Sequence, residues 1–324
     1  MKHAPQIRVV GLGQACVDYL GRVNKFPAED EKVELEELVM QCGGPASTAL
    51  VVLARLGVKV AFIGVVSDDP FGVKIQKELE LEGIDSTYLK TVPGFSSQFA
   101  FIAVTRDNGH RTIFWHRGTV PSLNADDVNL SPFSAAEILH LDGLMIEASI
   151  EAARQARRMG MRIVLDAGTM REGSLELVSM VDVLIASERF AEPIVGKQSP
   201  PEQTLAALRR LGPRQVVLTL GEKGSMALDH GMILFQRAFP VEAVDTTGAG
   251  DVYHGGYIYG LLKGWHMADC MRFASAASAL KCRMIGARKG IPGYAQLQEF
   301  LEIHKDIKTL RLSFSPPDPC SDCG

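Results

Sequence analysis

The segment Asp245-Thr246-Thr247-Gly248-Ala249-Gly250-Asp251 has the composition of a turn that binds an anion. Its glycines let the backbone turn sharply and approach another atom without a Cβ in the way. A helical pattern follows at about 250–263, so the free N–H groups and the positive end of the helix dipole point into the turn. Such a helix start suits a phosphate.

Asp251 lies on the first turn of this predicted helix. Phosphate binding alone explains a carboxylate there poorly, because like charges repel. The presence of a carboxylate in this turn makes chemical sense if the carboxylate accepts the proton of a hydroxyl group that attacks the phosphate. The sequence therefore predicts phosphoryl transfer with Asp251 as the base. We expect a low pKa for Asp251, since the helix dipole favours its charged form.

The elements that must position this turn follow from the pattern of the rest of the chain. Apolar runs alternate with helical patterns, which is typical of a parallel sheet covered by helices. The predicted strands are 7–11, 59–65, 137–141, 162–166, 181–186 and 215–220, and the predicted helices are 45–56, 70–82, 149–159, 201–211, 250–263, 267–284 and 294–308. We expect one α/β domain over 1–324, with a flexible tail at 312–324.

Two segments interrupt this alternation. Residues 31–41 have the pattern of an exposed strand, and 98–105 and 111–116 flank Asp107-Asn108-Gly109, a hairpin signal. We interpret them as a small accessory sheet, a lid inserted at about 31–41 and 97–117. An apolar exposed sheet covers a site or meets another subunit. The alternative is an edge extension of the main sheet.

Ligands of open α/β sheets bind beyond the carboxyl ends of the strands. The polar residues and glycines that follow predicted strands, or precede a predicted helix, are Asp18, Gly43-Gly44, Asp142, Asp166, Ser187, Glu188 and Thr219–Gly224. Ser187 and Asp166 are equally explained as helix N-caps. The glycines at 221 and 224 are also explained as a turn between two strands.

Composition excludes several classes of protein. The chain has 324 residues and a net charge of −4, with no basic stripe for nucleic acid. No apolar run approaches the roughly 20 residues that cross a bilayer, so we expect a cytoplasmic protein. The P-loop pattern is absent, and Gly11-Leu12-Gly13 is followed by Cys16 where the dinucleotide fingerprint needs glycine. Cys320 and Cys323 lack further ligands at zinc-site spacing.

These motifs resemble those of the PfkB carbohydrate kinases, also called the ribokinase-like family, over nearly the whole chain. Gly43-Gly44-Pro45-Ala46-Ser47-Thr48-Ala49 is similar to the first family signature, residues 245–251 to the second, and Thr219-Leu220-Gly221-Glu222-Lys223-Gly224-Ser225 to the nucleotide loop. The resemblance implies a three-layer α/β/α sandwich with a small β-sheet lid, which often mediates homodimerisation.

The resemblance also implies roles for particular residues. Asp251 is the base, and the amides of Gly248, Ala249 and Gly250 form an anion hole for the transferred phosphoryl group. The sugar-binding residues it implies are Asp18, Gly43 and Gly44, the residues on the ATP side are Thr219, Gly221 and Gly224, and a monovalent cation such as K⁺ lies near Asp245, Gly286 and Ala287. ATP and Mg²⁺ are the implied cofactors.

Two departures from the family pattern bear on specificity. Thr48 stands where the family has a substrate-binding asparagine, so the hydrogen bonds to the substrate differ. Ser187-Glu188-Arg189-Phe190 stands where the family has Asn-x-x-Glu on the Mg²⁺ and phosphate side, and Glu188 or Glu192 is the substitute. The Gly-Gly-Pro-Ala-x-Thr form and Leu280-Lys281-Cys282 resemble the sulfofructose kinase branch.

The hypothesis that unites these observations is an ATP-dependent kinase of a ribose- or fructose-like monosaccharide. One alternative is a kinase of an anionic sugar or a nucleoside on the same fold, with Arg106, Arg111 and Arg117 as candidate anchors for an anion. The others are a regulatory binding protein that has lost catalysis, and an NAD-dependent oxidoreductase.

Overall fold

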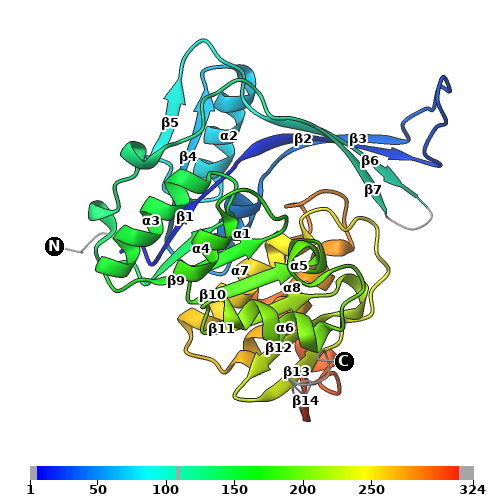
Figure 1. The fold of residues 1–324 in the computed structure, drawn as a ribbon. Coiled ribbons are helices and arrows are strands. Elements are labelled where there is room, and N and C mark those ends of the chain that lie inside the picture. The colour runs from blue at the N-terminus through cyan, green and yellow to red at the C-terminus, as the bar shows by residue number, and fades with distance from the viewer. Residues whose placement is uncertain (1–5, 107–109, 314–324) are drawn as a thin grey trace, which may run out of the picture.

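Figure 1 shows the computed structural model, which describes residues 6–106 and 110–313. A large sheet has the strand order β14-β13-β12-β11-β10-β9-β8-β1-β4-β5, and helices cover both of its faces. Its strands are β1 (Val9–Leu12), β4 (Val60–Ser67), β5 (Leu89–Val92), β8 (Ile138–Leu141), β9 (Arg162–Ala167), β10 (Val183–Ser187), β11 (Gln215–Thr219), β12 (Ser225–Asp229), β13 (Met232–Gln236) and β14 (Leu310–Ser313). The strands from β5 to β11 in this order are parallel, and β12, β13 and β14 are antiparallel.

Two hydrophobic cores lie on the two faces of the large sheet, because successive side chains of a strand point to opposite faces. On one face, Val9 and Val60 pack with the helices α1 (Pro45–Arg55), α2 (Pro70–Leu81), α7 (Ala249–Leu262), α8 (Met267–Cys282) and α9 (Tyr294–Ile303). On the other, Val10 and Ala61 pack with α3 (Ile146–Arg158), α4 (Ser174–Met180), α5 (Glu188–Val195) and α6 (Pro201–Arg210). The predicted three-layer sandwich is therefore confirmed.

A separate small sheet projects from one side of the molecule (Figure 1). Its order is β3-β2-β6-β7, with β2 (Cys16–Val23), β3 (Glu37–Gly43), β6 (Phe99–Thr105) and β7 (Arg111–His116). The chain first enters it directly after β1 and leaves it at Gly43, just before α1, and it returns for β6 and β7 between β5 and β8. The first entry and exit lie at the carboxyl end of β1, where the sheet rule places a ligand.

Several predicted boundaries are wrong. The strand predicted at 31–41 begins only at Glu37, and β2 was not predicted because Cys16–Val23 is buried on both faces and shows no alternation. The helix predicted at 294–308 ends at Ile303. Leu312 and Ser313, predicted to begin a flexible tail, belong to β14. The Asp107-Asn108-Gly109 turn and the two cysteines at 320 and 323 lie outside the described residues.

Within the described part of the chain, no helix is long and apolar enough to cross a membrane.

Candidate active site

The anion turn, residues 245–251, leads into α7 as the sequence predicts. Gly248 caps the helix with φ 74°, and a Cβ on it would lie 2.7 Å from the Cβ of Ala287. Only glycine fits there without displacing the neighbouring loop. The N–H of Ala249 donates to the carbonyl oxygen of Thr246 at 3.2 Å, whereas the N–H groups of Gly248 and Gly250 have no acceptor among the described residues. Two of the three amides assigned to the anion hole are thus free to bind an anion.

Asp245 holds the anion turn in place from within the protein. Its buried carboxylate accepts hydrogen bonds from the N–H and hydroxyl of Thr247, at 2.8 and 2.7 Å, and from the N–H of Gly286 at 2.6 Å. The hydroxyl of Ser278 donates to the carbonyl oxygen of Ala249 at 2.8 Å. The turn is therefore fixed against α8 and the loop that follows it.

Asp251 lies on the first turn of α7, and its surroundings raise its pKa rather than lower it. Burial raises the pKa most, and the negative charge of Asp18 adds to this effect. Interactions with His254, Arg111 and Lys281 lower it, but by less than burial raises it. The low pKa expected from the helix dipole was therefore wrong in direction, because the loss of water around the carboxylate outweighs the dipole.

His254 supports the same turn of helix. Its Nδ1 lies 2.7 Å from the carbonyl oxygen of Gly250 and 3.4 Å from Oδ2 of Asp166. A carbonyl oxygen only accepts, so Nδ1 carries a proton. Burial lowers the pKa of His254, which favours its neutral form. The ring thus fixes the carbonyl group next to Asp251, and Asp166 is not an N-cap but a buried acid beside it.

The side chain of Asp18 on β2 lies against Gly43 on β3, whose register partner is Cys16. The Asp18 carboxylate is 5% exposed, and burial raises its pKa. A Cβ on Gly43 would lie 2.0 Å from Oδ2 of Asp18, so only glycine allows the two strands to pair with the acid between them. Gly44 has φ 98°, and a Cβ there would lie 2.3 Å from the carbonyl oxygen of Gln14. The residues assigned to sugar hydroxyls therefore form one tight corner beside α1.

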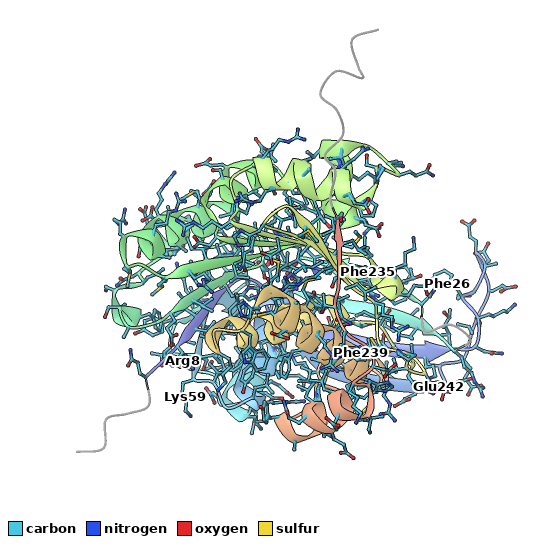
Figure 2. All side chains as sticks on the ribbon, turned by 90° about the horizontal axis from the view of Figure 1, so that it is seen from below. Arg8, Phe26, Lys59, Phe235, Phe239 and Glu242 are labelled. Carbon is cyan, nitrogen blue, oxygen red and sulfur yellow. The ribbon has the colours of Figure 1, made fainter. Side chains whose placement is uncertain are left out.

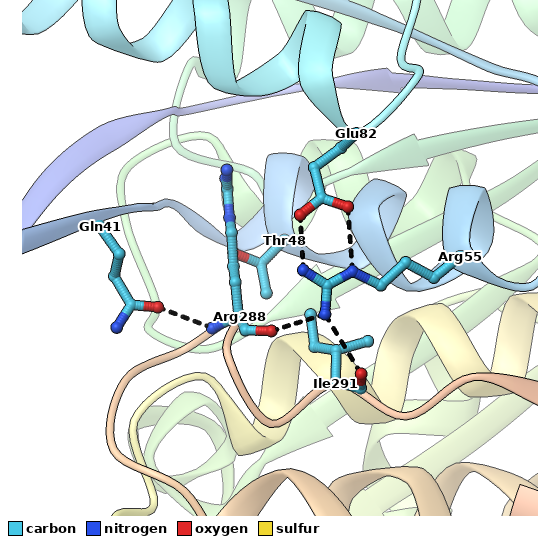
Figure 3. Close-up of polar contacts among 6 residues, drawn as sticks. All are labelled: Gln41, Thr48, Arg55, Glu82, Arg288 and Ile291. Atoms are coloured by element: carbon cyan, nitrogen blue, oxygen red, sulfur yellow. Dashed lines mark hydrogen bonds and ion pairs between the residues drawn. The ribbon is translucent and has the colours of Figure 1, made fainter. Parts of the chain in front are cut away.

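Thr48 is fully buried on α1. Its hydroxyl group contacts Arg288, a residue that the sequence analysis did not assign to the site. Nε of Arg288 lies 3.3 Å from the Thr48 hydroxyl, and its Nη2 donates to the carbonyl oxygen of Gly43 at 3.0 Å and to the hydroxyl of Ser47 at 2.7 Å. Figure 3 shows Arg288 rising from its loop between Gln41 and Thr48. Its Nη1 is buried without a partner in the described structure.

The loop that carries Arg288 is itself held by two side chains. The N–H of Arg288 donates to Oε1 of Gln41 at 2.9 Å. Arg55 donates to the carbonyl oxygens of Arg288 and Ile291 at 2.9 and 3.2 Å, and pairs with Glu82 through both of its carboxylate oxygens (Figure 3). The buried guanidinium of Arg288 is thus fixed in place beside the Gly43-Gly44 corner.

On the other side of the anion turn, Ser187 and Thr219 are register partners at the ends of β10 and β11. The Ser187 hydroxyl accepts from the N–H of Phe190 at 3.1 Å, so Ser187 is the N-cap of α5, the alternative left open by the sequence. Gly221 and Gly224, with φ 58° and 110°, form the turn between two strands, β11 and β12. Glu188 is exposed on the first turn of α5.

Of the three arginines considered as anion anchors, only Arg111 contacts the anion turn. Its guanidinium donates to the Thr246 hydroxyl at 2.8 Å. Arg106 pairs with Glu36 at 3.1 Å, and Arg117 donates to Ser122. The small sheet therefore contacts the anion turn directly.

The structure brings most of the predicted site residues to one edge of the large sheet. It adds Arg288 and Lys281, which come from the end of the chain and become neighbours of the site only on folding. The sequence feature that could have pointed to Lys281 is its position as a single lysine in the otherwise apolar C-terminal end of α8. No cluster of three or more metal-ligating side chains occurs in residues 6–106 and 110–313.

Comparison with known proteins shows the family of this chain. Residues 6–293 match the family described as pfkB family carbohydrate kinase. The chain is 31% identical to the ribokinase of Haemophilus influenzae over 301 residues, 90% of this chain and 97% of the relative. It is 28% identical to the deoxyribokinase of Salmonella typhi over 306 residues, 91% and 98% of the two chains.

Among solved structures, a putative ribokinase from Agrobacterium tumefaciens superposes with a TM-score of 0.83 at 26% identity, covering 93% of this chain and 99% of that one. The residues matched by the family model include those of the small sheet, the corner at Gly43-Gly44 and the anion turn. The chain therefore belongs to the pfkB family of carbohydrate kinases, phosphotransferases with an alcohol as acceptor.

Proposed function

We propose that this protein is an ATP-dependent kinase that phosphorylates a hydroxyl group of a monosaccharide. The observation that carries the proposal is Asp251, which lies at the start of α7 beside the free amides of Gly248 and Gly250 and within the electrostatic influence of Asp18. An acceptor hydroxyl held by Asp18 would then lie between a base and an anion hole.

The transfer itself needs mainly positioning and electrostatic stabilisation, because its transition state is loose. Asp251 accepts the proton of the acceptor hydroxyl as the new P–O bond forms and the bond to ADP breaks. The raised pKa of Asp251 makes it a stronger base than an ordinary aspartate. The amides of Gly248 and Gly250 would donate to the oxygens of the transferred group.

The nucleotide would lie along the ends of β10 and β11, against Ser187, Thr219 and the turn from Gly221 to Gly224. Mg²⁺ commonly binds through one or two carboxylates together with substrate phosphates. This fits the absence of a preformed cluster of metal ligands in the described residues. Glu188 and Glu192 of α5 are the proposed carboxylates on that side, and Mg²⁺ would neutralise charge on the phosphates.

The surroundings of Arg288 favour a second candidate function, that of a kinase of an anionic sugar. Its guanidinium is 4% exposed and has no carboxylate within 4.0 Å among the described residues. The two N–H groups of Nη1 have no partner there. A buried, incompletely bonded cation beside the acceptor corner suits a carboxylate, phosphate or sulfonate of the acceptor.

A coupled assay of ADP release tests both candidates. Ketoses, pentoses, nucleosides and anionic sugars are offered with ATP and Mg²⁺. The proposal expects turnover with at least one neutral or anionic sugar. Nucleotide binding without turnover on any acceptor would instead support a regulatory protein that has lost catalysis.

The small sheet would act as a lid and as the interface of a homodimer. The exposed apolar residues on its edge strands are Leu38, Met40, Ile113, Phe114 and Trp115. Phe26, which lies at the projecting end of the molecule (Figure 2), stacks on Phe114 with ring centroids 6.4 Å apart. Exposed apolar edge strands are normally covered. Sedimentation velocity of Trp115→Lys against the wild type tests this, and a wild-type monomer at micromolar concentration would refute it.

A further inference from the structure

Gln41 lies on the small sheet directly opposite Asp18, the acid assigned to the acceptor. The two residues are register partners of the antiparallel strands β3 and β2. Opposite side chains of such a pair share one face of the sheet, with Cβ atoms about 5 Å apart. Gly43 belongs to the same face, two residues further along β3. The side chain of Gln41 therefore stands beside the corner at Gly43-Gly44, although the sequence analysis assigned it no role.

The amide group of Gln41 is fixed in one orientation. Its Oε1 accepts the N–H of Arg288 at 2.9 Å, as Figure 3 shows. Because an N–H only donates, this bond assigns the oxygen and leaves Nε2 on the other side of the amide. Gly286 makes room for Nε2, since a Cβ at that position would lie 1.4 Å from it. The nitrogen of the amide is thus held in a defined place beside the loop of Arg288.

The Nε2 group of Gln41 is buried without a hydrogen-bond partner in the described part of the chain. It carries two N–H donors, and leaving buried donors unpaired destabilises the fold. Arg288, whose Nη1 is likewise buried without a partner, is hydrogen-bonded to the same glutamine. Unpaired donors on two connected side chains beside one corner point to a ligand that accepts hydrogen bonds there.

Asp18 offers a complementary acceptor on the same face of the small sheet. Its Oδ1 accepts the thiol of Cys16 at 3.2 Å. Its Oδ2, which lies against Gly43, receives no hydrogen bond from residues 6–106 or 110–313. A hydroxyl group both donates and accepts hydrogen bonds. One hydroxyl of a ligand between the two side chains can therefore donate to Asp18 and accept from Gln41.

In the proposed function, Asp18 holds hydroxyl groups of the acceptor. The hydroxyl that is phosphorylated gives its only proton to Asp251 during the transfer, so it does not donate to Asp18 at that moment. We propose that Nε2 of Gln41 binds a second hydroxyl of the acceptor, the one that donates to Asp18, and that Gln41 thereby selects sugars with this hydroxyl over their deoxy analogues. The inference rests on the proposed function and adds a residue that determines its specificity.

Deoxy analogues of the acceptor test this role by kinetics. The acceptor found by the ADP-release screen is compared with its monodeoxy analogues, each of which lacks one hydroxyl that is not phosphorylated. With the wild type, we expect one analogue to lose about 100-fold in kcat/KM, because it leaves both Gln41 and Asp18 unpaired. With Gln41→Met, which has no amide, the parent sugar should lose about tenfold and that analogue less than about twofold. A wild type that accepts every analogue equally well would overturn the inference.

Further variants separate recognition of the hydroxyl from a disturbed loop. Gln41→Asn, which draws the amide back by one carbon atom, should show the same pattern as Gln41→Met. Arg55→Met loosens the loop of Arg288 without reaching the corner, so it should lower kcat/KM for the parent sugar and for every analogue by the same factor. Gln76→Met changes an exposed glutamine of α2 and should match the wild type. Gln41 variants that behave like Arg55→Met would show that Gln41 only supports the loop and overturn the inference.

Binding without nucleotide separates this inference from the proposed function. Calorimetry gives the Kd of the parent sugar and of its analogues for the wild type and for Gln41→Met. If no acceptor of the screen is turned over, the parent sugar is the member of the same panel that raises the melting temperature most. A preference for one hydroxyl that falls about tenfold in the variant would then support the role of Gln41 and count against the kinase function alone. A panel in which no sugar binds would overturn both.

Discussion

Arg111 of the small sheet donates a hydrogen bond to the hydroxyl of Thr246, which lies within the anion turn, at 2.8 Å. This bond joins a hairpin strand to the start of α7 across 135 residues of sequence. It places a guanidinium where it lowers the pKa of Asp251. The small sheet is therefore coupled electrostatically to the anion turn.

Removing this contact should weaken catalysis moderately. Arg111 is exposed, so solvent screens much of its charge, and we expect Arg111→Met to lower kcat/KM about tenfold. Arg106→Met is the matched control, because Arg106 lies at the same end of the hairpin but pairs with Glu36. Steady-state kinetics of both variants check this, and equal losses in the two would show that the effect is not specific to Thr246.

The role of Asp251 is tested by Asp251→Asn. The amide keeps the size of the side chain but accepts no proton, so kcat should fall at least ~100-fold, the usual scale for a general base. Binding of acceptor and ATP, measured by calorimetry, should persist. Asp269→Asn provides the control, since Asp269 is an exposed acid on the first turn of α8. Near-normal turnover of Asp251→Asn would show that another group takes the proton.

The direction of the pKa shift of Asp251 makes a prediction about stability. A carboxyl group whose pKa is raised in the folded state contributes stability below its unfolded pKa of about 3.9, and this is lost as pH rises through the folded pKa. Asp251→Asn should therefore melt at a higher temperature than the wild type at pH 7. The difference should disappear at a pH below the unfolded value, as scanning calorimetry at several pH values would reveal. A variant less stable than the wild type at neutral pH would contradict the shift.

Arg288 should set the affinity for the acceptor and not for ATP. Its bonds to Gly43, Ser47 and Thr48 hold the corner on which the acceptor would bind. We expect Arg288→Met to raise the acceptor KM about tenfold or more, the scale of a lost charge-assisted hydrogen bond, with the ATP KM unchanged. Arg55→Met is the control for stability, because Arg55 holds the same loop without reaching the corner. A parallel rise of both KM values would place Arg288 outside the acceptor site.

The sequence predicts the local parts of this site well. The turn at 245–251 and the bend at Gly43-Gly44 depend on residues adjacent in the chain, where glycine freedom and helix starts carry the information. Strands β5, β13 and β14 were missed because each is short and lacks a clear alternation.

The long-range parts of the site were not predictable in this way. A sequence pattern predicts that charged residues such as Arg288 and Lys281 are exposed to solvent, yet both side chains are buried. Their partners, Gly43 and Asp245, lie far away in the chain. The pKa of Asp251 was misjudged for a related reason, because desolvation depends on the complete fold and not on the helix start alone.

Two of the four connections between the sheets lie at Cys16 and Gly43, beside the acid assigned to the acceptor. Any mutation that adapts this corner to a new sugar therefore also changes how the small sheet is attached to the rest of the molecule. Substrate range and the placement of the small sheet would then evolve together in this chain, since natural selection on either acts on the same few peptide units.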